Sequence, residues 1–531
     1  MTWWHDAVVY QIYPRSFADA NGDGTGDLPG VTSRMDHLAS LGVDAIWLSP
    51  FYRSPLADGG YDVADYCDVD PRFGTLADFD AMVAAATERG IRVIVDIVPN
   101  HCSSEHPLFQ DALAAAPGGP ERDLFIFREG KGPDGAEPPN NWQSAFGGPA
   151  WTRLPDGQWY LHLFDPGQPD WNWLHPEVPA LFERVLRFWL DRGVVGFRVD
   201  VANYLFKDPT LPDDEGPRSY GVPDARSNRP ELHDVYRRWR EILDSYETGS
   251  FPGERTAVAE NWSLPEHLKP YLTYRGLPQT FNPMLLVQLW NAPAMRLGID
   301  TMLDVTGDVP GRAPWVLGNH DFVRPATRYG WREARMFMQP GPDTAIDAEL
   351  GARRARAGAL LQLALPGSAY VYQGEELGLP EVLDLPDSAR DDPTFFRTGG
   401  RRIGRDGCRV PIPWSGSAPP FGFSPDGSAT WLPQPDRWAG LTVEAAEADP
   451  GSMLHLYRAA IARRPVGLPF GWVSEPNDEV LHFTRGDGFA CVVNMGSEPV
   501  SLPSGSLVLG SSPDVVAGGS LPPDAAVWLA L

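Results

Sequence analysis

GFRVDVA, at residues 196–202, is the stretch of sequence on which the interpretation of the fold depends. Its apolar residues alternate with Arg198 and Asp200, which predicts a β-strand whose two ionic side chains share one face. A helical pattern over residues 176–192 precedes it, and a helix followed by a strand that ends in a carboxylate is typical of the rim of a parallel βα barrel. Arg198 is expected to keep Asp200 ionised, as a nucleophile or electrostatic stabiliser, although a structural ion pair has the same pattern.

The same alternation of helix and strand continues along the chain. Eight strand-like runs occur, at residues 8–13, 43–48, 92–97, 196–201, 256–260, 277–281, 314–317 and 369–372. Apolar spacing near 3.6 separates most of them, at residues 28–42, 76–90, 179–193, 232–246 and 353–367. Eight strands alternating with helices predict a parallel (β/α)8 TIM barrel.

Two segments interrupt this rhythm. Residues 102–172 are rich in Gly, Pro, Trp and Asn, and a connection of that length is typical of a functional lid or a small domain. After residue 464 short β-type runs follow, at 480–483, 489–494, 507–509 and 526–529. We therefore expect a barrel at 1–101 and 173–464, an inserted subdomain at 102–172, and a C-terminal antiparallel β-sandwich at 465–531.

The composition disfavours several classes of partner and location. With 44 Lys and Arg against 70 Asp and Glu, the net charge is −26, which argues against nucleic acids and anionic membrane surfaces. No apolar run is long enough to span a membrane, and residues 1–17 lack the segments of a secretion signal. The cysteines have neither metal-ligand nor disulfide-framework spacing; they are Cys67, Cys102, Cys408 and Cys491. We expect a cytoplasmic protein with reduced thiols, and the sequence does not indicate its oligomeric state.

Acidic residues stand at the ends of four predicted strands. Asp96, Asp200 and Glu260 end the third, fourth and fifth strands, and Asp321 follows the seventh. Because barrel strands all end at one face, these side chains are expected to converge. Cleavage of a glycoside needs one protonated carboxyl for the leaving oxygen and one ionised carboxyl for the anomeric centre. Asp200, beside Arg198, is the better anion, and Glu260, on an apolar strand, is the better acid.

Four motifs carry a resemblance to a known family. DIVPNH (96–101), GFRVDVA (196–202), AENW (259–262) and GNHD (318–321) resemble the four signature regions of glycoside hydrolase family 13, the α-amylase family. QPDWNW (168–173), residues 60–75 and VYQGEELGL (371–379) agree with it. WWHDAVVYQIYPRSF (3–17) and GRDGCRVPIPW (404–414) are similar to the α-glucosidase and oligo-1,6-glucosidase branch. The resemblance covers nearly the whole chain and implies a barrel, a domain inserted after the third strand, and a C-terminal β-domain.

The resemblance also implies residue roles. Asp200 would be the nucleophile, Glu260 the acid/base, and Asp321 a residue that grips two sugar hydroxyls. The subsite for the non-reducing glucose would be lined by Asp62, His101, Arg198 and His320, with Tyr61 stacked beneath the sugar. Arg405 is expected to pair with Asp62 and close the pocket, and Arg409 is the competing choice. Further candidates are Phe164, Gln168 and Asn261. A pocket closed at one end implies an exo-acting enzyme.

A metal loop is expected after the first strand. Residues 19–27 carry oxygen-bearing side chains at alternate positions around glycine, the spacing of a calcium loop, but without the closing Glu of an EF-hand. By resemblance to the branch, a structural Ca²⁺, or Mg²⁺ in its place, would be held by the side chains of Asp19, Asn21, Asp23 and Asp27 and by the Thr25 carbonyl. Asn100 matches the calcium position of the true α-amylases, but the insertion offers it no evident partner ligands. No organic cofactor is expected.

The leading hypothesis is a retaining, exo-acting α-glucosidase that releases glucose from short maltose- or isomaltose-type oligosaccharides through a covalent β-glucosyl-enzyme. A transglucosylase, or an isomerase such as a trehalose synthase, would use the same three acids. A non-catalytic relative, like the amino-acid-transporter heavy chains, would have lost catalytic acids that this chain keeps. Trp171, Val410 and Ile412 depart from the residues more usual in the branch, and together with Val201 they leave the α-1,4 or α-1,6 preference open.

Overall fold

Eight parallel strands form one sheet in the order β11-β10-β9-β5-β2-β1-β13-β12. They are β1 (Val8–Ile12), β2 (Ala45–Leu48), β5 (Arg92–Ile97), β9 (Gly196–Val199), β10 (Thr256–Glu260), β11 (Gln279–Phe281), β12 (Pro314–Val316) and β13 (Ser368–Tyr372). The two end strands, β11 and β12, lie in contact, so the sheet closes into a barrel. All eight predicted strands are confirmed. The computed structural model describes residues 2–216, 222–246, 251, 255–272, 276–281, 283–307, 312–334, 339–425, 427–474, 478–516 and 519–531.

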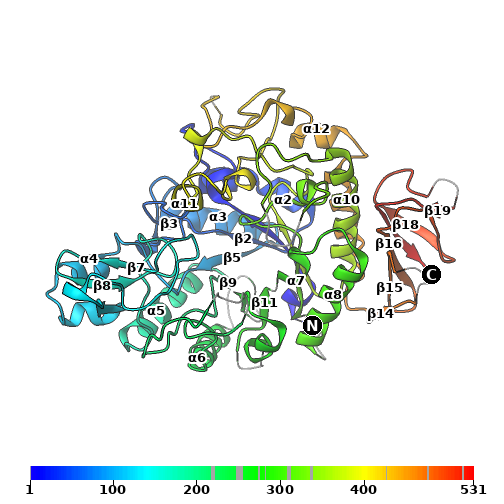
Figure 1. The fold of residues 1–531 in the computed structure, drawn as a ribbon. Helices are drawn as coiled ribbons and strands as arrows, with labels where there is room; N and C mark the ends of the chain where they lie inside the picture. The colour runs from blue at the N-terminus through cyan, green and yellow to red at the C-terminus, as the bar shows by residue number, and fades with distance from the viewer. Residues whose placement is uncertain are drawn as a thin grey trace.

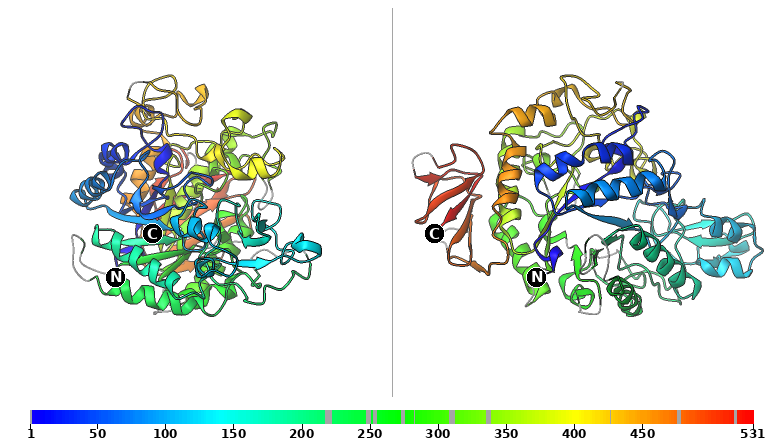
Figure 2. Two further views of the ribbon diagram at one scale, coloured as in Figure 1. Left: turned by 90° about the vertical axis from the view of Figure 1, so that its left-hand side faces the viewer. Right: turned by 180° about the vertical axis from the view of Figure 1, so that it is seen from behind.

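Helices surround the barrel, as Figures 1 and 2 show. They include α1 (Leu28–Ser33), α2 (Met35–Leu41), α3 (Leu76–Glu88), α5 (Glu177–Asp191), α6 (Leu232–Asp244), α7 (Pro283–Leu286), α8 (Ala292–Thr306), α9 (Pro325–Arg328), α10 (Ala348–Ala364), α12 (Val443–Ala448) and α13 (Met453–Ala462). The pattern at 28–42 predicted one helix, but the structure has two, which part at Arg34. The Arg34 guanidinium lies 4.4 Å from the centre of a Trp414 ring and donates to the Gly422 carbonyl, so tertiary contacts accompany the break.

A small antiparallel sheet lies between β5 and α5, where the insertion was predicted. Its strands are β6 (Phe127–Glu129), β8 (Gln158–Leu161) and β7 (Trp151–Arg153), in that order, and α4 (Pro107–Ala114) precedes them. Trp142, Trp151 and Leu161 are buried in a core of its own. A two-stranded sheet of β3 (Tyr52–Arg53) and β4 (Asp65–Val69) and the short α11 (Pro393–Arg397) belong to connections of the barrel. The limits 102–172 stay a prediction.

The C-terminal part is antiparallel, as predicted. A five-stranded sheet has the order β14 (Phe470–Trp472), β15 (Val480–Arg485), β16 (Phe489–Asn494), β20 (Ala525–Ala530) and β18 (Ser506–Gly510). A second, two-stranded sheet pairs β17 (Val500–Ser501) with β19 (Ser520–Leu521). Figures 1 and 2 place this part and the insertion at opposite ends of the barrel. No helix among the described residues is both long and apolar enough to cross a membrane.

Candidate active site

One guanidinium gathers three carboxyl groups at the ends of neighbouring strands. Arg198, near the end of β9, is 1% exposed. Its Nη1 lies 2.9 Å from Asp96 Oδ1 and 2.6 Å from Asp200 Oδ1. Its Nη2 lies 2.6 Å from Glu260 Oε2. Parallel pairing of β5, β9 and β10 brings the three acids together, so their predicted convergence is confirmed.

A single cation cannot compensate three carboxylates, and the cluster therefore favours retention of a proton. Burial raises the pKa of Asp96 to about 6. Burial and the neighbouring carboxyls also raise the pKa of Asp200, although Arg198 opposes that shift. Arg198 is shared with Asp96 and Glu260, so its effect on Asp200 is divided, and the ionisation of Asp200 stays a prediction.

The fourth acid, Asp321, contacts two arginines. Asp321 Oδ1 accepts hydrogen bonds from Arg405 Nη1 at 3.0 Å and from Arg409 Nη2 at 2.9 Å. Burial opposes ionisation of Asp321, but the neighbouring cationic groups outweigh it and hold the pKa of Asp321 below its usual range. His320 Nε2 lies 3.4 Å from Asp321 Oδ2, and burial lowers the pKa of His320 to about 3, so this ring is neutral. Asp321 is therefore an anion with two fixed arginine partners.

The predicted pairing of Arg405 with Asp62 is wrong. Arg405 Nη2 lies 2.6 Å from Asp58 Oδ1, and its Nε lies 2.6 Å from Asp392 Oδ2. Asp62 accepts hydrogen bonds from the backbone N–H groups of Ala57 and Asp58, so its carboxyl is turned into its own loop. Burial raises the pKa of Asp62 to about 7. Arg409, the competing choice, also pairs with Asp321 rather than with Asp62.

Most of the other predicted residues lie together around the buried Tyr61. The Tyr61 and His320 rings are stacked with centroids 5.2 Å apart, and the Tyr61 hydroxyl donates to Asp96 Oδ2 at 2.9 Å. His101 Nε2 lies 3.0 Å from the Tyr61 carbonyl and 3.1 Å from Gln168 Nε2. The Phe164 ring lies 5.0 Å from the His101 ring. The structure thus brings Tyr61, His101, Phe164, Gln168 and His320 together next to the acids.

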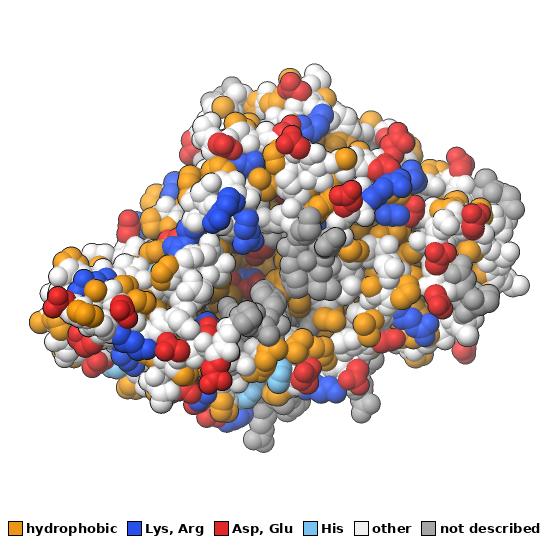
Figure 3. Space-filling model, viewed as in Figure 1, with side chains coloured by type: hydrophobic (Ala, Val, Ile, Leu, Met, Phe, Trp, Pro, Cys, Tyr) orange, Lys and Arg blue, Asp and Glu red, His pale blue; other side chains and the backbone are white. Residues whose placement is uncertain are grey.

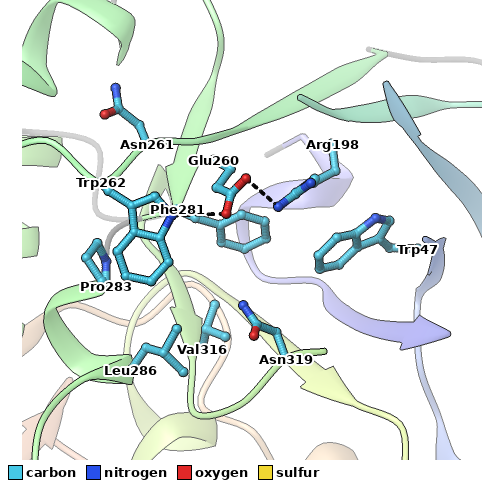
Figure 4. A pocket seen from close by; sticks show the side chains of 10 residues that line it. All are labelled: Trp47, Arg198, Glu260, Asn261, Trp262, Phe281, Pro283, Leu286, Val316 and Asn319. Atoms are coloured by element: carbon cyan, nitrogen blue, oxygen red, sulfur yellow. Dashed lines mark hydrogen bonds and ion pairs between the residues drawn. The ribbon is translucent and has the colours of Figure 1, made fainter. Parts of the chain in front are cut away.

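A cavity with about 400 Å³ of empty volume opens beside Glu260 (Figure 4). It is lined by Trp47, Arg198, Glu260, Asn261, Trp262, Phe281, Pro283, Leu286, Val316 and Asn319. Of the three carboxyls that contact Arg198, only that of Glu260 lines this cavity. Figure 3 shows the face of the molecule that is seen in Figure 1, and its surface is hollowed near the middle, with charged side chains visible in the hollow. Apolar side chains form most of the cavity wall, with a few polar groups among them, as in sites that bind small organic ligands.

Several residues of the site were missed by sequence reasoning. Asp58 and Asp392, which contact Arg405, stand in no motif that pairs them with an arginine, and only the folded loops bring them to it. Trp47 donates from Nε1 to Asp96 Oδ2 at 3.1 Å. Trp262 donates from Nε1 to Glu260 Oε1 at 3.0 Å. Trp262 did have a signal, because residues two apart on an extended segment point the same way.

An ammonium group joins Asn100 to the insertion. Lys207 Nζ lies 2.7 Å from Asn100 Oδ1 and 2.7 Å from Asp170 Oδ2, and all three residues are buried. Burial lowers the pKa of Lys207, and Asp170 opposes the shift. The two oxygens that a cation could bridge at this point are therefore bridged by Lys207.

The predicted metal loop is held by its own hydrogen bonds. Asp19 accepts from the N–H groups of Gly22 and Gly24, at 2.7 and 2.8 Å, and Asp27 accepts from that of Gly30 at 2.6 Å. Among the described residues, no group of three or more His, Cys, Asp and Glu side chains is placed to hold a metal ion. The Asn21 side chain and the Thr25 carbonyl are ligand types outside that set. The cation at Asp19, Asn21, Asp23, Thr25 and Asp27 stays a prediction.

Comparison with known proteins assigns the chain to a family. The family described as alpha amylase, catalytic domain matches residues 11–466. The chain belongs to the alpha-amylase family. A second family, described as a domain of unknown function, DUF3459, matches residues 462–528 of this alpha-amylase-family protein.

The relatives of this alpha-amylase-family protein are enzymes. A probable alpha-glucosidase of Rhizobium meliloti (strain 1021) is 39% identical over 93% of this chain and 90% of its own length. An oligo-1,6-glucosidase of Parageobacillus thermoglucosidasius is 34% identical over 87% of this chain and 83% of its own length. The crystal structure of an alpha-glucosyl transfer enzyme has a TM-score of 0.85 and 35% identity, covering 100% of this chain and 99% of its own. The protein is a glycoside hydrolase of the α-glucosidase branch.

Proposed function

We propose that this protein is a retaining, exo-acting α-glucosidase that releases glucose from the non-reducing end of short α-glucosides. The observation that carries the proposal is the sharing of Arg198 by Asp96, Asp200 and Glu260. A retained proton is what the first half of a retaining mechanism needs, because one acid must be protonated while another attacks. Glu260 is the acid that lines the cavity, so we assign the transferred proton to Glu260.

The reaction has two displacements. An Asp200 oxygen forms a bond to the anomeric carbon as the glycosidic C–O bond breaks, and the electron pair of that bond stays on the leaving oxygen, which takes the Glu260 proton. Glu260, now a carboxylate, takes a proton from water, whose oxygen attacks the anomeric carbon and returns the electron pair of the ester bond to Asp200. Arg198, Val201 and Trp262 each place a donor next to the Glu260 carboxyl, and these donors suit the carboxylate that Glu260 becomes after it has given up its proton.

Asp321 and its arginines support exo-action. The ionised Asp321, next to the neutral His320 ring, is suited to accept hydrogen bonds from two sugar hydroxyls. Arg405 contacts Asp58, Asp321 and Asp392 at once, so it fixes one wall of the site. A fixed charged wall favours a single terminal glucose over a chain that passes through. The substrate would be a small oligosaccharide, and we propose a cytoplasmic location.

Glucosyl transfer is the second candidate function. It is favoured by the likeness to a solved alpha-glucosyl transfer enzyme. Water and a sugar hydroxyl use the same Glu260 step, so the acids alone do not distinguish hydrolysis, transfer to an external acceptor, and rearrangement of a disaccharide as in a trehalose synthase.

The test is glucose release from maltose, isomaltose, sucrose and trehalose by wild type and Asp200→Ala, with products resolved by chromatography. We expect glucose from maltose or isomaltose, and a loss of at least about a thousandfold in the variant, since the nucleophile is removed. Asp36→Ala, at an exposed position on α2, is the matched control and should keep full activity. Longer products or a rearranged disaccharide would favour transfer, and no turnover of any substrate would refute the glucosidase.

A further inference from the structure

The two oxygens of the Glu260 carboxyl have different surroundings (Figure 4). Oε2 accepts from Arg198 Nη2 at 2.6 Å and from the Val201 backbone N–H at 3.1 Å. Val201 has a φ of 35°, a left-handed conformation that is a genuine outlier for a β-branched residue, and this turn belongs to the geometry that presents its N–H to Oε2. Oε1 accepts from the indole Nε1 of Trp262 at 3.0 Å. Only Oε1 is left without an arginine partner, so it is the oxygen suited to carry the transferred proton.

The indole of Trp262 is fixed from its other side. Its ring is stacked on that of Phe322, with centroids 5.3 Å apart and an angle of 12° between the planes. Phe322 follows directly on Asp321, so the stack joins the end of β10 to the loop after β12. Both Glu260 and Trp262 line the cavity, and Figure 4 shows the carboxyl between the indole nitrogen and the guanidinium. The carboxyl is therefore held from two sides.

We propose that Trp262 is a positioning residue that holds the proton-transferring oxygen of Glu260 toward the leaving group. The proposal rests on the function proposed above, in which Glu260 is the acid. An indole N–H only donates, so it cannot take the proton from Glu260 itself. By occupying one acceptor direction of Oε1, it leaves the remaining direction for the proton and fixes the rotation of the carboxyl. Proton transfer needs such alignment within hydrogen-bond reach of the leaving oxygen.

The test compares two substrates that differ in their need for an acid. Maltose, or whichever disaccharide the wild type cleaves, requires a proton on the leaving sugar oxygen, whereas α-D-glucosyl fluoride releases fluoride without one. Trp262→Phe keeps the ring stack and removes the N–H. We expect kcat/KM for the disaccharide to fall about ten- to a hundredfold, the value of a hydrogen bond to a charged group, and that for the fluoride to stay within about twofold.

Two further variants make the result interpretable. Trp472→Phe is the matched control: it removes the indole donor that β14 of the C-terminal sheet offers to the Asp300 carboxylate of α8, and it should leave kcat/KM for both substrates unchanged. Glu260→Gln should lower kcat/KM for the disaccharide far more than kcat/KM for the fluoride. If both values fall equally, the proposed role of Glu260 fails. Suppose that Glu260→Gln shows this difference between the substrates, but Trp262→Phe lowers kcat/KM for both substrates equally or for neither. The positioning role of Trp262 is then refuted, while the proposed function stands.

Discussion

At the scale of single residues, Glu375 is a buried acid outside the proposed catalytic site. Its Oε2 accepts from the Tyr457 hydroxyl at 3.3 Å, and its Oε1 faces the Tyr372 N–H at 3.4 Å. Burial raises the pKa of Glu375 to about 8, although Arg324 and Arg328 oppose the shift. Between the ordinary pKa of Glu and about 8, the folded state holds a proton that the unfolded state has lost. Stability contributed by this group is therefore complete below about pH 4 and falls as the pH rises to about 8.

We predict that Glu375→Gln removes this pH dependence. The melting temperature of the variant minus that of the wild type should become more positive from about pH 5 to about pH 8, by an amount equivalent to roughly 3–5 kcal/mol. The measurement is thermal unfolding at a series of pH values in one buffer system. Glu349→Gln, at an exposed position at the start of α10, should instead give a curve parallel to that of the wild type. A curve for Glu375→Gln that is parallel as well would contradict the assignment.

The sequence predicted the acids of the site better than their partners. Alternation along one strand was enough to place Arg198 and Asp200 on one face, and this pair is confirmed. That Arg198 also contacts Asp96 and Glu260 depends on the register of three strands, which no single strand encodes. The predicted pairing of Arg405 with Asp62 was wrong for a similar reason. Asp58 and Asp62 lie in one loop, and only its folding decides which carboxylate turns outward.

At the scale of elements, the loop 19–27 joins β1 to α1. Asp27 is the N-cap of α1, and its carboxyl, whose pKa is raised by burial, accepts from the Gly30 N–H. The other oxygen-bearing side chains accept from nearby backbone N–H groups, as Asn21 does from Asp23 at 2.9 Å. These turns hold the loop through hydrogen bonds to its own side chains.

We predict that Ca²⁺ stabilises the protein through this loop. Removal of divalent ions with a chelator should lower the melting temperature, and excess Ca²⁺ should restore it, by about 1–3 °C at a hundredfold excess over Kd. Asp23→Asn, at an exposed position of the loop, should weaken the effect because it removes one charged ligand. Calorimetric titration of Ca²⁺, with Mg²⁺ as the comparison, checks the binding itself. Absence of both a binding heat and a thermal shift would contradict the prediction.

In α10, apolar spacing predicts the helix but not which of its sides are buried. Spacing near 3.6 correctly predicted a helix at 353–367, yet Ala357, Leu360 and Leu363 are buried together with Ala359 and Leu361 on other sides of it. Both sides are buried because α10 packs between the barrel and the C-terminal sheet. The C-terminal half of α10 is buried on nearly all sides and has no single apolar stripe, so its sequence predicts a helix but not the elements that pack against it.

At the scale of the whole molecule, the C-terminal sheet is joined to the barrel through α10. Trp528 of β20 is fully buried and donates from Nε1 to the Leu360 carbonyl at 3.1 Å. Arg485 donates from Nη1 to the Ala364 carbonyl at 2.7 Å, and Arg354 pairs with Asp524 at 2.7 Å. Two hydrogen bonds and one ion pair thus join the C-terminal part to α10, next to the buried Trp528 ring. The two parts are therefore expected to unfold together, although the acids of the proposed catalytic site all lie in the barrel.

We predict that Trp528→Ala lowers the free energy of unfolding of the whole chain by about 3–5 kcal/mol, because it leaves a cavity between α10 and the sheet. Denaturation in urea, followed by far-UV circular dichroism and by glucosidase activity, should give one shared midpoint that moves to lower urea. Leu507→Ala, on the same sheet but 45% exposed, should move it by an amount equivalent to less than about 0.5 kcal/mol. If activity instead persisted after the sheet had unfolded, the barrel would be stable without it, and the joint burial of α10 would not govern the stability of the site.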